Sequence, residues 1–386
     1  MRRLRESWLL RAVALLAGVL ATSGRALGAT QYVITNDDPG VSFYTIAPDG
    51  ALTLRQQVPI GGFGNVAGLF GTNRIRALDS GNQQCVYASV ASTGEIVGIA
   101  VATLTVEGSA TGSPTDGGTS NGIGLAINSQ YLYASFTDSN TIGTFSVEAG
   151  CSLAFLDDVS VGGLAGGIIN GMEIHGAMLI ATYTDGSIES FDISAGTPVS
   201  HGDKQYSTAT LSSLDATYPN AIDITSDGRF AIFGDTSTSV VVEVSDISSG
   251  TLTPTVVYTT EASINSSNVM LSPDETLLYV INTQGASVSA LFFDKTTGTL
   301  SEGCKSGPVK GQSVNWSYLA GLGLVSESGT GGGVYVAEYG STSGVAQVSL
   351  TVTGQRCSLQ EVTGSPFVDP NTLGLLSIGT FPPRSF

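Results

Sequence analysis

Apolar side chains recur along the chain in short, strand-like units rather than with the period of a helix. An aromatic or β-branched triplet occurs seven times, at spacings of 46 to 56 residues. In most units a second segment follows in which apolar positions alternate, as at Val288, Ala290 and Phe292. Period-two alternation is typical of a β-strand. The seven triplets are 32–34, 86–88, 132–134, 179–181, 230–232, 278–280 and 334–336.

Two further strands are predicted in each unit. A glycine turn followed by leucine, as in Gly298-Thr299-Leu300, indicates a hairpin that leads into an outer strand, because glycine adopts positive φ without strain. An inner strand precedes the triplet, as at 221–225, and a turn such as Ser226-Asp227-Gly228 joins the two. A four-stranded antiparallel sheet cannot bury both faces alone, and radial stacking of about seven such sheets does so. We therefore predict an all-β, seven-bladed β-propeller that occupies residues 29–386 as one domain.

The two ends of the repeat region predict how the ring closes. Residues 31–36 read as the second strand of a blade, with no inner strand before them. Residues 373–378 read as one extra strand after the seventh unit is complete. We expect this C-terminal strand to complete blade one as its inner strand.

Residues 1–28 have the pattern of a secretory signal peptide. Arg2, Arg3 and Arg5 precede an uncharged apolar stretch at 12–21, and small residues frame a cleavage site after Gly28. A stretch of about ten residues is too short to cross a bilayer, which takes roughly 20. We predict a periplasmic or extracellular protein whose mature form has no membrane span.

The charge balance excludes one class of partner. The chain has a formal net charge of −17, and residues 1–28 hold five Arg and one Glu, a net of +4, so the mature chain carries −17 − 4 = −21. Such a surface repels phosphate backbones, and we expect no nucleic-acid partner. Four cysteines allow three disulfide pairings, which stay open, and their spacing with only two histidines argues against a zinc site. We predict no cofactor and a monomer.

One repeat carries a resemblance. Tyr279-Val280-Ile281-Asn282, followed by 288–293 and Thr297-Gly298-Thr299-Leu300, looks like the YVTN repeat, and Tyr32-Val33-Ile34-Thr35-Asn36 is a second instance. The chain is similar to the lactonase-type seven-bladed propellers, which include 6-phosphogluconolactonases and carboxymuconate cyclases, and to secreted bacterial YVTN propellers. The resemblance covers the whole mature chain and implies the fold. It also implies a lactone hydrolase or cycloisomerase, although the repeat residues build blades rather than sites.

Three charged residues are the candidate catalytic groups. Counting three residues after the asparagine that opens an inner strand gives Arg76, Glu173 and Asp223 in three different blades. Two carboxylates and a guanidinium near the propeller axis can act as general base, general acid and anion clamp. Neighbouring carboxylates also raise one pKa. The alternative is a structural role, in which these groups pair with the backbone or with each other between blades.

A second set of polar residues lies on one face of the predicted disc. Asparagines open four successive inner strands, and acidic residues follow several second strands. They are Asn121, Asn170, Asn220 and Asn268, and Asp138, Asp185, Asp235 and Glu338. Together they can bind a small polar ligand, a protein partner or a Ca²⁺ ion assembled from separate blades, or they are ordinary turn residues. His175 is expected in a turn on the opposite face and His201 in an outer loop.

Three functions compete on these observations. The first is an exported binding or interaction module that uses the acidic, Asn-lined face, since no catalytic motif such as G-x-S-x-G is present. The second is a lactone hydrolase or cycloisomerase, as the resemblance implies. The third is a structural protein of the envelope.

Overall fold

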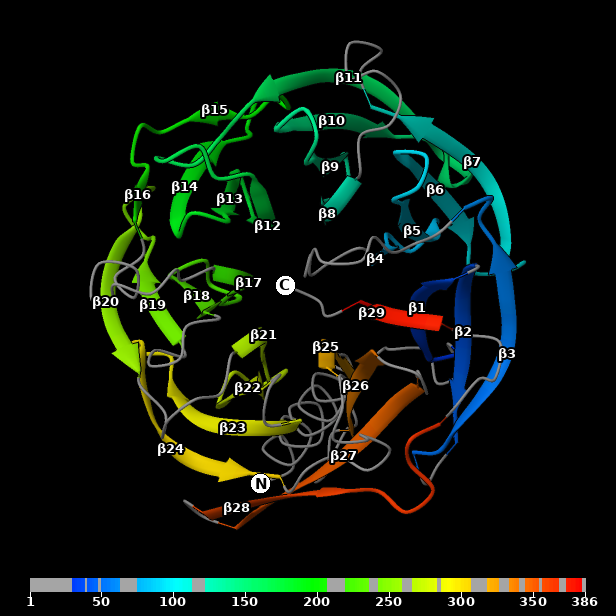
Figure 1. The fold of residues 1–386 in the computed structure, drawn as a ribbon, viewed down its shortest axis with the longest axis vertical. Coiled ribbons are helices and arrows are strands. Elements are labelled where there is room, and N and C mark those ends of the chain that lie inside the picture. Colours follow the sequence, from blue (N-terminus) through cyan, green and yellow to red (C-terminus); the bar gives the residue numbers. More distant parts are fainter. Residues whose placement is uncertain are drawn as a thin grey trace, which may run out of the picture. The chain divides into compact units, whose positions relative to one another are not determined.

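The computed structural model of the chain describes one compact unit, Gln31–Phe386, as seven β-sheets arranged in a ring (Figure 1). The described residues are 30–38, 40–47, 50–62, 75–112, 122–206, 219–235, 242–258, 266–282, 286–306, 318–325, 333–339, 344–353, 356–367 and 373–383. Within these ranges the only helix is a single 3₁₀ turn, η2 (Ala149–Cys151). In the same ranges no helix is long and apolar enough to cross a membrane.

Each sheet is a blade whose strands run from the centre outward. Blade 1 consists of β29 (Leu373–Phe381), β1 (Tyr32–Asp38), β2 (Gly40–Ile46) and β3 (Leu52–Pro59). Blade 2 is β4 (Ile75–Asp79), β5 (Gln84–Val90), β6 (Glu95–Ala100) and β7 (Thr105–Thr111). Blade 3 is β8 (Gly122–Ile127), β9 (Tyr131–Phe136), β10 (Thr141–Val147) and β11 (Leu153–Ser160).

The remaining blades follow in chain order. Blade 4 is β12 (Ile169–His175), β13 (Met178–Tyr183), β14 (Ser187–Asp192), β15 (Val199–Ser200) and β16 (Gln205–Tyr206). Blade 5 is β17 (Pro219–Ile224), β18 (Phe230–Asp235), β19 (Val242–Asp246) and β20 (Thr253–Tyr258). Blade 6 is β21 (Ser266–Leu271), β22 (Leu277–Asn282), β23 (Ser287–Asp294) and β24 (Thr299–Lys305). Blade 7 is β25 (Tyr318–Val325), β26 (Gly333–Tyr339), β27 (Gly344–Thr353) and β28 (Arg356–Glu361).

The predicted closure of the ring is confirmed. β29 pairs antiparallel with β1, with Tyr32 opposite Phe381 and Ile34 opposite Gly379. The strand is longer than the predicted 373–378, and it is the inner strand of blade 1 (Figure 1). The first blade is therefore built from both ends of the described unit.

The apolar triplets bury their side chains between neighbouring blades. All six residues of β22 are buried. Tyr279 and Ile281 of blade 6 pack in one cluster with Val334 and Val336 of blade 7. Because each blade supplies one wall of such a cluster, each sheet buries its faces only against its neighbours, as radial stacking requires.

Two repeat tyrosines also join each blade to the next by a hydrogen bond. The Tyr133 hydroxyl donates to the Gly196 carbonyl of blade 4 (2.8 Å), and the Tyr335 hydroxyl donates to the Gly50 carbonyl of blade 1 (3.0 Å). Both glycines have positive φ, +96° and +86°, and both lie in the turn that leads to an outer strand. The recurrent Tyr and Gly of the repeat thus couple blades as well as forming them.

Both disulfides cross a boundary between blades. Cys85 of β5 bonds to Cys151 of η2, which links blade 2 to blade 3. Cys304 of β24 bonds to Cys357 of β28, which links blade 6 to blade 7. Among the three pairings that the sequence left open, the structure selects this one.

The outer strand of blade 4 differs from the predicted single strand. It is split into β15 and β16, which both pair with β14, and residues 201–204 lie between them. The Asp203 carboxylate accepts hydrogen bonds from the Ser190 N–H (3.0 Å) and from the Leu252 N–H of blade 5 (3.0 Å). A side chain therefore replaces backbone pairing at this point and ties the split strand to the next blade.

Candidate functional site

The inner strands of six blades present one structurally equivalent position. In register, each such residue lies opposite the central residue of the second strand, for example Glu173 opposite Ile180 and Asp223 opposite Ile232. From blade 2 to blade 7 the set is Arg76, Ala126, Glu173, Asp223, Met270 and Gly323. We call this set the axial ring, because the inner strands surround the centre of the sheet arrangement (Figure 1). Its three charged members are the three predicted catalytic residues.

The sequence alignment by asparagine works in blades 4 and 5 and shifts in blades 3 and 6. The inner strands contain a β-bulge near their start, and its extra residue is Asn170 in β12 and Asn220 in β17. In β21 the extra residue is Ser267, so Asn268 lies one position further along. Bulges re-aim side chains and are frequent near functional sites. The three-residue count from Asn170 and Asn220 therefore holds, whereas the residue three after Asn268 is not in the axial ring.

Arg76 reaches across blade 3 to blade 4. Its Nη2 forms an ion pair with Glu173 Oε2 (2.5 Å), and its Nε donates to the Leu125 carbonyl (2.7 Å). Nη2 also lies 3.5 Å from the Met172 carbonyl oxygen. Ala126 is the member of the ring between them, and it has no side chain beyond Cβ to occupy this path. Within the described residues Nη1 donates to no protein group.

Glu173 is a buried carboxylate held in one orientation. Its side chain is 10% exposed, and Oε1 accepts a hydrogen bond from the Ile174 N–H (3.1 Å). Burial raises the pKa of Glu173 above its ordinary value, against the lowering effect of Arg76, and the negative charge of Asp223 raises it further. A raised carboxyl pKa brings the group closer to the pH at which a general base works best.

Asp223 supplies a second buried carboxylate on the neighbouring inner strand. Oδ1 accepts from the Ile224 N–H (2.8 Å), and Oδ2 accepts from the Leu271 N–H of blade 6 (2.6 Å). These contacts show that the structural alternative is partly right, because all three charged residues also connect blades. They leave Asp223 with its charge uncompensated by any ion pair in the described part of the chain.

The predicted Asn and acidic set does not gather into a single group. Asn170 and Asn268 are buried, Asp138 is exposed, and the side chains of Asn121, Asn220, Asp235 and Glu338 lie outside the described residues. Asp185 accepts from the Ala165 N–H, the Gly167 N–H and the Ser187 hydroxyl. Although burial raises the pKa of Asp185, these hydrogen bonds hold it below the ordinary value. Asp185 therefore organises the 163–167 loop.

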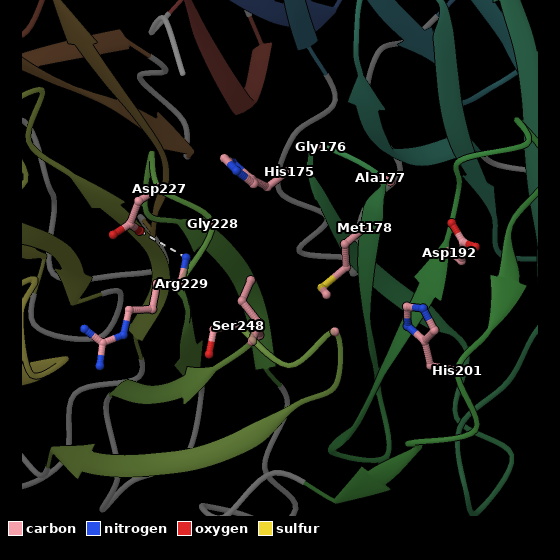
Figure 2. Close-up of a pocket in the computed structure, with 12 residues that line it drawn as sticks. His175, Gly176, Ala177, Met178, Asp192, His201, Asp227, Gly228, Arg229 and Ser248 are labelled. Carbon is pink, nitrogen blue, oxygen red and sulfur yellow. Dashed lines mark hydrogen bonds between the residues drawn. The ribbon is translucent and has the colours of Figure 1, made fainter.

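The structure brings both histidines to one groove that the sequence did not predict (Figure 2). The groove encloses about 590 Å³ between the turns of blades 4 and 5. Figure 2 shows Met178 between His175 and His201, with Asp192 beside His201. His175 is the last residue of β12, two positions after Glu173, and its ring packs against Gly228 of blade 5. The Arg229 side chain points away from the histidines, and its Nη1 donates to the Thr296 carbonyl.

The hydrogen bonds of His201 fix which ring nitrogen faces the groove. The Ser190 hydroxyl donates to Asp203 Oδ2 (2.7 Å) and lies 2.8 Å from His201 Nδ1. Because an ionised carboxylate only accepts, the hydroxyl proton belongs to that bond, and Nδ1 must carry a proton to donate to Ser190. Nε2 is then the nitrogen left for the groove. The signal for this site was the Gly202-Asp203 break in the outer strand of blade 4.

No metal centre is formed by the residues that the structure describes. Within them, no group of three or more His, Cys, Asp or Glu side chains could hold a metal ion. A Ca²⁺ site assembled from Asp138, Asp185, Asp235 and Glu338 thus finds no support from the described members, since Asp185 already binds its own loop. The chemistry of the axial ring is that of a buried base, a guanidinium and a second carboxylate.

Comparison with known proteins agrees with this architecture. The periplasmic gluconolactonase PpgL of Pseudomonas aeruginosa has 14% sequence identity and a TM-score of 0.67, over 91% of this chain and 99% of that chain. A putative 6-phosphogluconolactonase from Bacteroides uniformis has 14% identity and a TM-score of 0.66, over 92% and 100%. The Bacteroides fragilis protein of the same description has 14% identity and a TM-score of 0.62, over 93% and 99%. At this identity the likeness shows the fold alone, and no curated protein sequence matches the chain.

The sequence match is more specific than the structural one. The family model described as lactonase, 7-bladed beta-propeller, matches residues 85–306. This segment runs from the second strand of blade 2 to the end of blade 6, and it contains Glu173 and Asp223. The chain belongs to the lactonase family of seven-bladed β-propellers.

Proposed function

We propose that the protein is a lactone hydrolase whose reaction takes place at the axial ring. The observation that carries this proposal is the buried, ion-paired Glu173 on an inner strand of a lactonase-family propeller. The raised pKa of Glu173 suits a general base, and Arg76 orients the carboxylate through its own bonds to blades 3 and 4. The named activities of the structural neighbours, gluconolactonase and putative 6-phosphogluconolactonase, are of the same class.

Each axial residue has a defined part in the proposed reaction. Glu173 takes a proton from water as the water oxygen bonds to the lactone carbonyl carbon. The Arg76 Nη1 group donates to the carbonyl oxygen as it becomes negative, which stabilises the tetrahedral intermediate. The ring C–O bond then breaks, and the proton held by Glu173 passes to the departing ring oxygen. The product is the open hydroxy acid, which releases one proton at neutral pH.

Asp223 tunes the base in this proposal rather than transferring the proton. Both its oxygens accept backbone N–H groups, whereas its charge raises the pKa of Glu173. The proposal therefore replaces the earlier expectation of Asp223 as general acid with an electrostatic role. It also replaces the expectation of Arg76 as an anion clamp, because two of its three nitrogens already bind protein groups.

The binding-module expectation has less support. It rested on an acidic, Asn-lined face, and the described members of that face are dispersed or bound to their own loops. The family match, by contrast, concerns the part of the chain that holds the axial carboxylates. For these reasons we place the enzyme reading first.

Proton release from purified protein with glucono-δ-lactone tests the proposal, measured above the uncatalysed rate. We expect turnover by the wild-type protein and a loss of at least 100-fold in kcat for Glu173→Gln, the size typical of general base catalysis. Glu189→Gln is the matched control, because Glu189 is also buried in blade 4 and ion-paired, to Lys204 at 3.0 Å, but lies outside the axial ring. Unchanged activity in Glu173→Gln, or no turnover of any lactone, refutes the proposal.

We further propose that residues 1–28 direct export and are removed. Two disulfides are ordinary in an oxidising compartment and rare in the bacterial cytosol. The Pseudomonas neighbour is described as periplasmic. Mass determination of the protein from the extracytoplasmic fraction should give a chain that begins near Ala29. A chain that retains residues 1–28 in the cytosol contradicts this proposal.

A further inference from the structure

We infer that Asp223 restricts the proposed lactone site to uncharged substrates and excludes lactones that carry a phosphate or a carboxylate. This inference rests on the proposed function and narrows its substrate class. It concerns an uncharged polyhydroxy lactone, such as a sugar lactone, as opposed to a phosphorylated sugar lactone or a lactone acid.

The first step is that the single cation of the axial ring is already engaged. Arg76 forms an ion pair with Glu173 and donates to the Leu125 carbonyl, and its Nη2 also faces the Met172 carbonyl. Binding a phosphate takes a guanidinium whose charge and paired donors are available for a bidentate contact. Only Nη1 remains, and the proposed reaction uses it at the carbonyl oxygen.

The second step is the balance of charge around the ring. An ionised Glu173 cancels the charge of Arg76, and Asp223 then leaves one excess negative charge. The other ring members, Ala126, Met270 and Gly323, carry none. A dianionic phosphate near this site is repelled by a carboxylate that is buried and weakly screened.

The third step is the field of the whole molecule. The chain has 32 acidic and 15 basic residues, a net charge of −17. A surface of one sign lowers the local concentration of ligands of the same sign. Local and global charge therefore act in the same direction against anionic lactones.

A comparison of two substrates tests the inference. We expect kcat/KM for glucono-δ-lactone to exceed that for 6-phosphoglucono-δ-lactone by at least 100-fold in the wild-type protein. In Asp223→Asn the ratio should narrow by about tenfold, because one charge is removed while the side-chain oxygen still accepts a backbone N–H. Glu189→Gln, whose carboxylate lies outside the axial ring, should leave the ratio unchanged.

A second measurement needs no variant and covers the case in which Asp223→Asn fails to fold. Raising the salt concentration screens repulsion. In wild-type protein it should therefore increase kcat/KM for the phosphorylated lactone and leave that for the neutral lactone unchanged. Equal or faster turnover of the phosphorylated lactone, or a ratio that ignores both salt and Asp223→Asn, overturns the inference and leaves the lactone hydrolase proposal standing. No turnover of either lactone overturns the proposed function itself.

Discussion

Removing Arg76 should destabilise the protein in a pH-dependent way. In Arg76→Met, Glu173 loses its ion pair, and the Leu125 and Met172 carbonyls lose a donor. Removing one partner of a buried ion pair costs about 3–5 kcal/mol when the other charge stays buried. The two carbonyl contacts alone account for about 1–2 kcal/mol, at roughly 1 kcal/mol for a good hydrogen bond and less for the long one.

The sign of the pH effect follows from Glu173. Its pKa is already raised by burial, and the loss of Arg76 raises it further. The folded variant then holds a proton that the unfolded chain releases, so its stability is retained below the unfolded pKa of about 4.3 and falls as pH rises toward the folded value. We therefore expect a loss of about 3–5 kcal/mol at pH 8 and about 1–2 kcal/mol at pH 5.

Urea unfolding of wild-type and variant proteins at both pH values measures this difference. Arg229→Met is the matched control, because Arg229 has an exposed side chain and lies 3.9 Å from its carboxylate partner Asp246. Exposed pairs contribute about 0–1 kcal/mol, and this control should show no change between pH 5 and pH 8. Adding Glu173→Gln to Arg76→Met should remove the pH dependence. An equal loss at both pH values, or a double variant that keeps the dependence, refutes the buried pair as the cause.

Three further predictions concern blades and base. Replacing Cys304 and Cys357 by serine should lower the free energy of unfolding by about 4 kcal/mol, the chain-entropy value for a 53-residue separation. A loss under about 1 kcal/mol in urea unfolding would contradict this. Tyr133→Phe should cost about 1–2 kcal/mol in thermal unfolding, because the Gly196 carbonyl loses a buried donor. Asp223→Asn should move the acid limb of kcat/KM to lower pH, since its charge raises the pKa of the axial glutamate. A limb that stays in place would reject that coupling.

The fold was predictable because its determinants are local and repeated. Each apolar triplet predicts a strand by composition, and each Gly turn predicts a hairpin by its φ requirement. In blade 5 the triplet 230–232 was placed one residue early, because Ile232 pairs with Asp223 at the ring position. The surplus strand after the seventh unit left only one place for 373–378, and the pairing of Tyr32 with Phe381 agrees.

The candidate site was predictable in membership and not in contacts. The spacing from Asn170 and Asn220 places Glu173 and Asp223 at one level because antiparallel register is regular. That Arg76 spans blade 3 depends on side-chain length and on the small Ala126, which no spacing rule contains. The histidine groove depends on a local break at 201–204, where Asp203 replaces backbone pairing. Disulfide pairing depends on which blades are neighbours, which the four cysteine positions alone do not specify.

The pairing of β1 with β29 has a consequence for how the chain reaches its native state. Asp38 and Leu373 are partners although they lie 335 positions apart (373 − 38 = 335). The other six sheets consist of consecutive hairpins, whose contacts have low sequence separation. Loop-closure entropy and contact order both place the long-range pairing at a kinetic disadvantage. We expect closure of blade 1 to be the slow step of folding, with an open arc of preformed blades as the species that awaits the last strand.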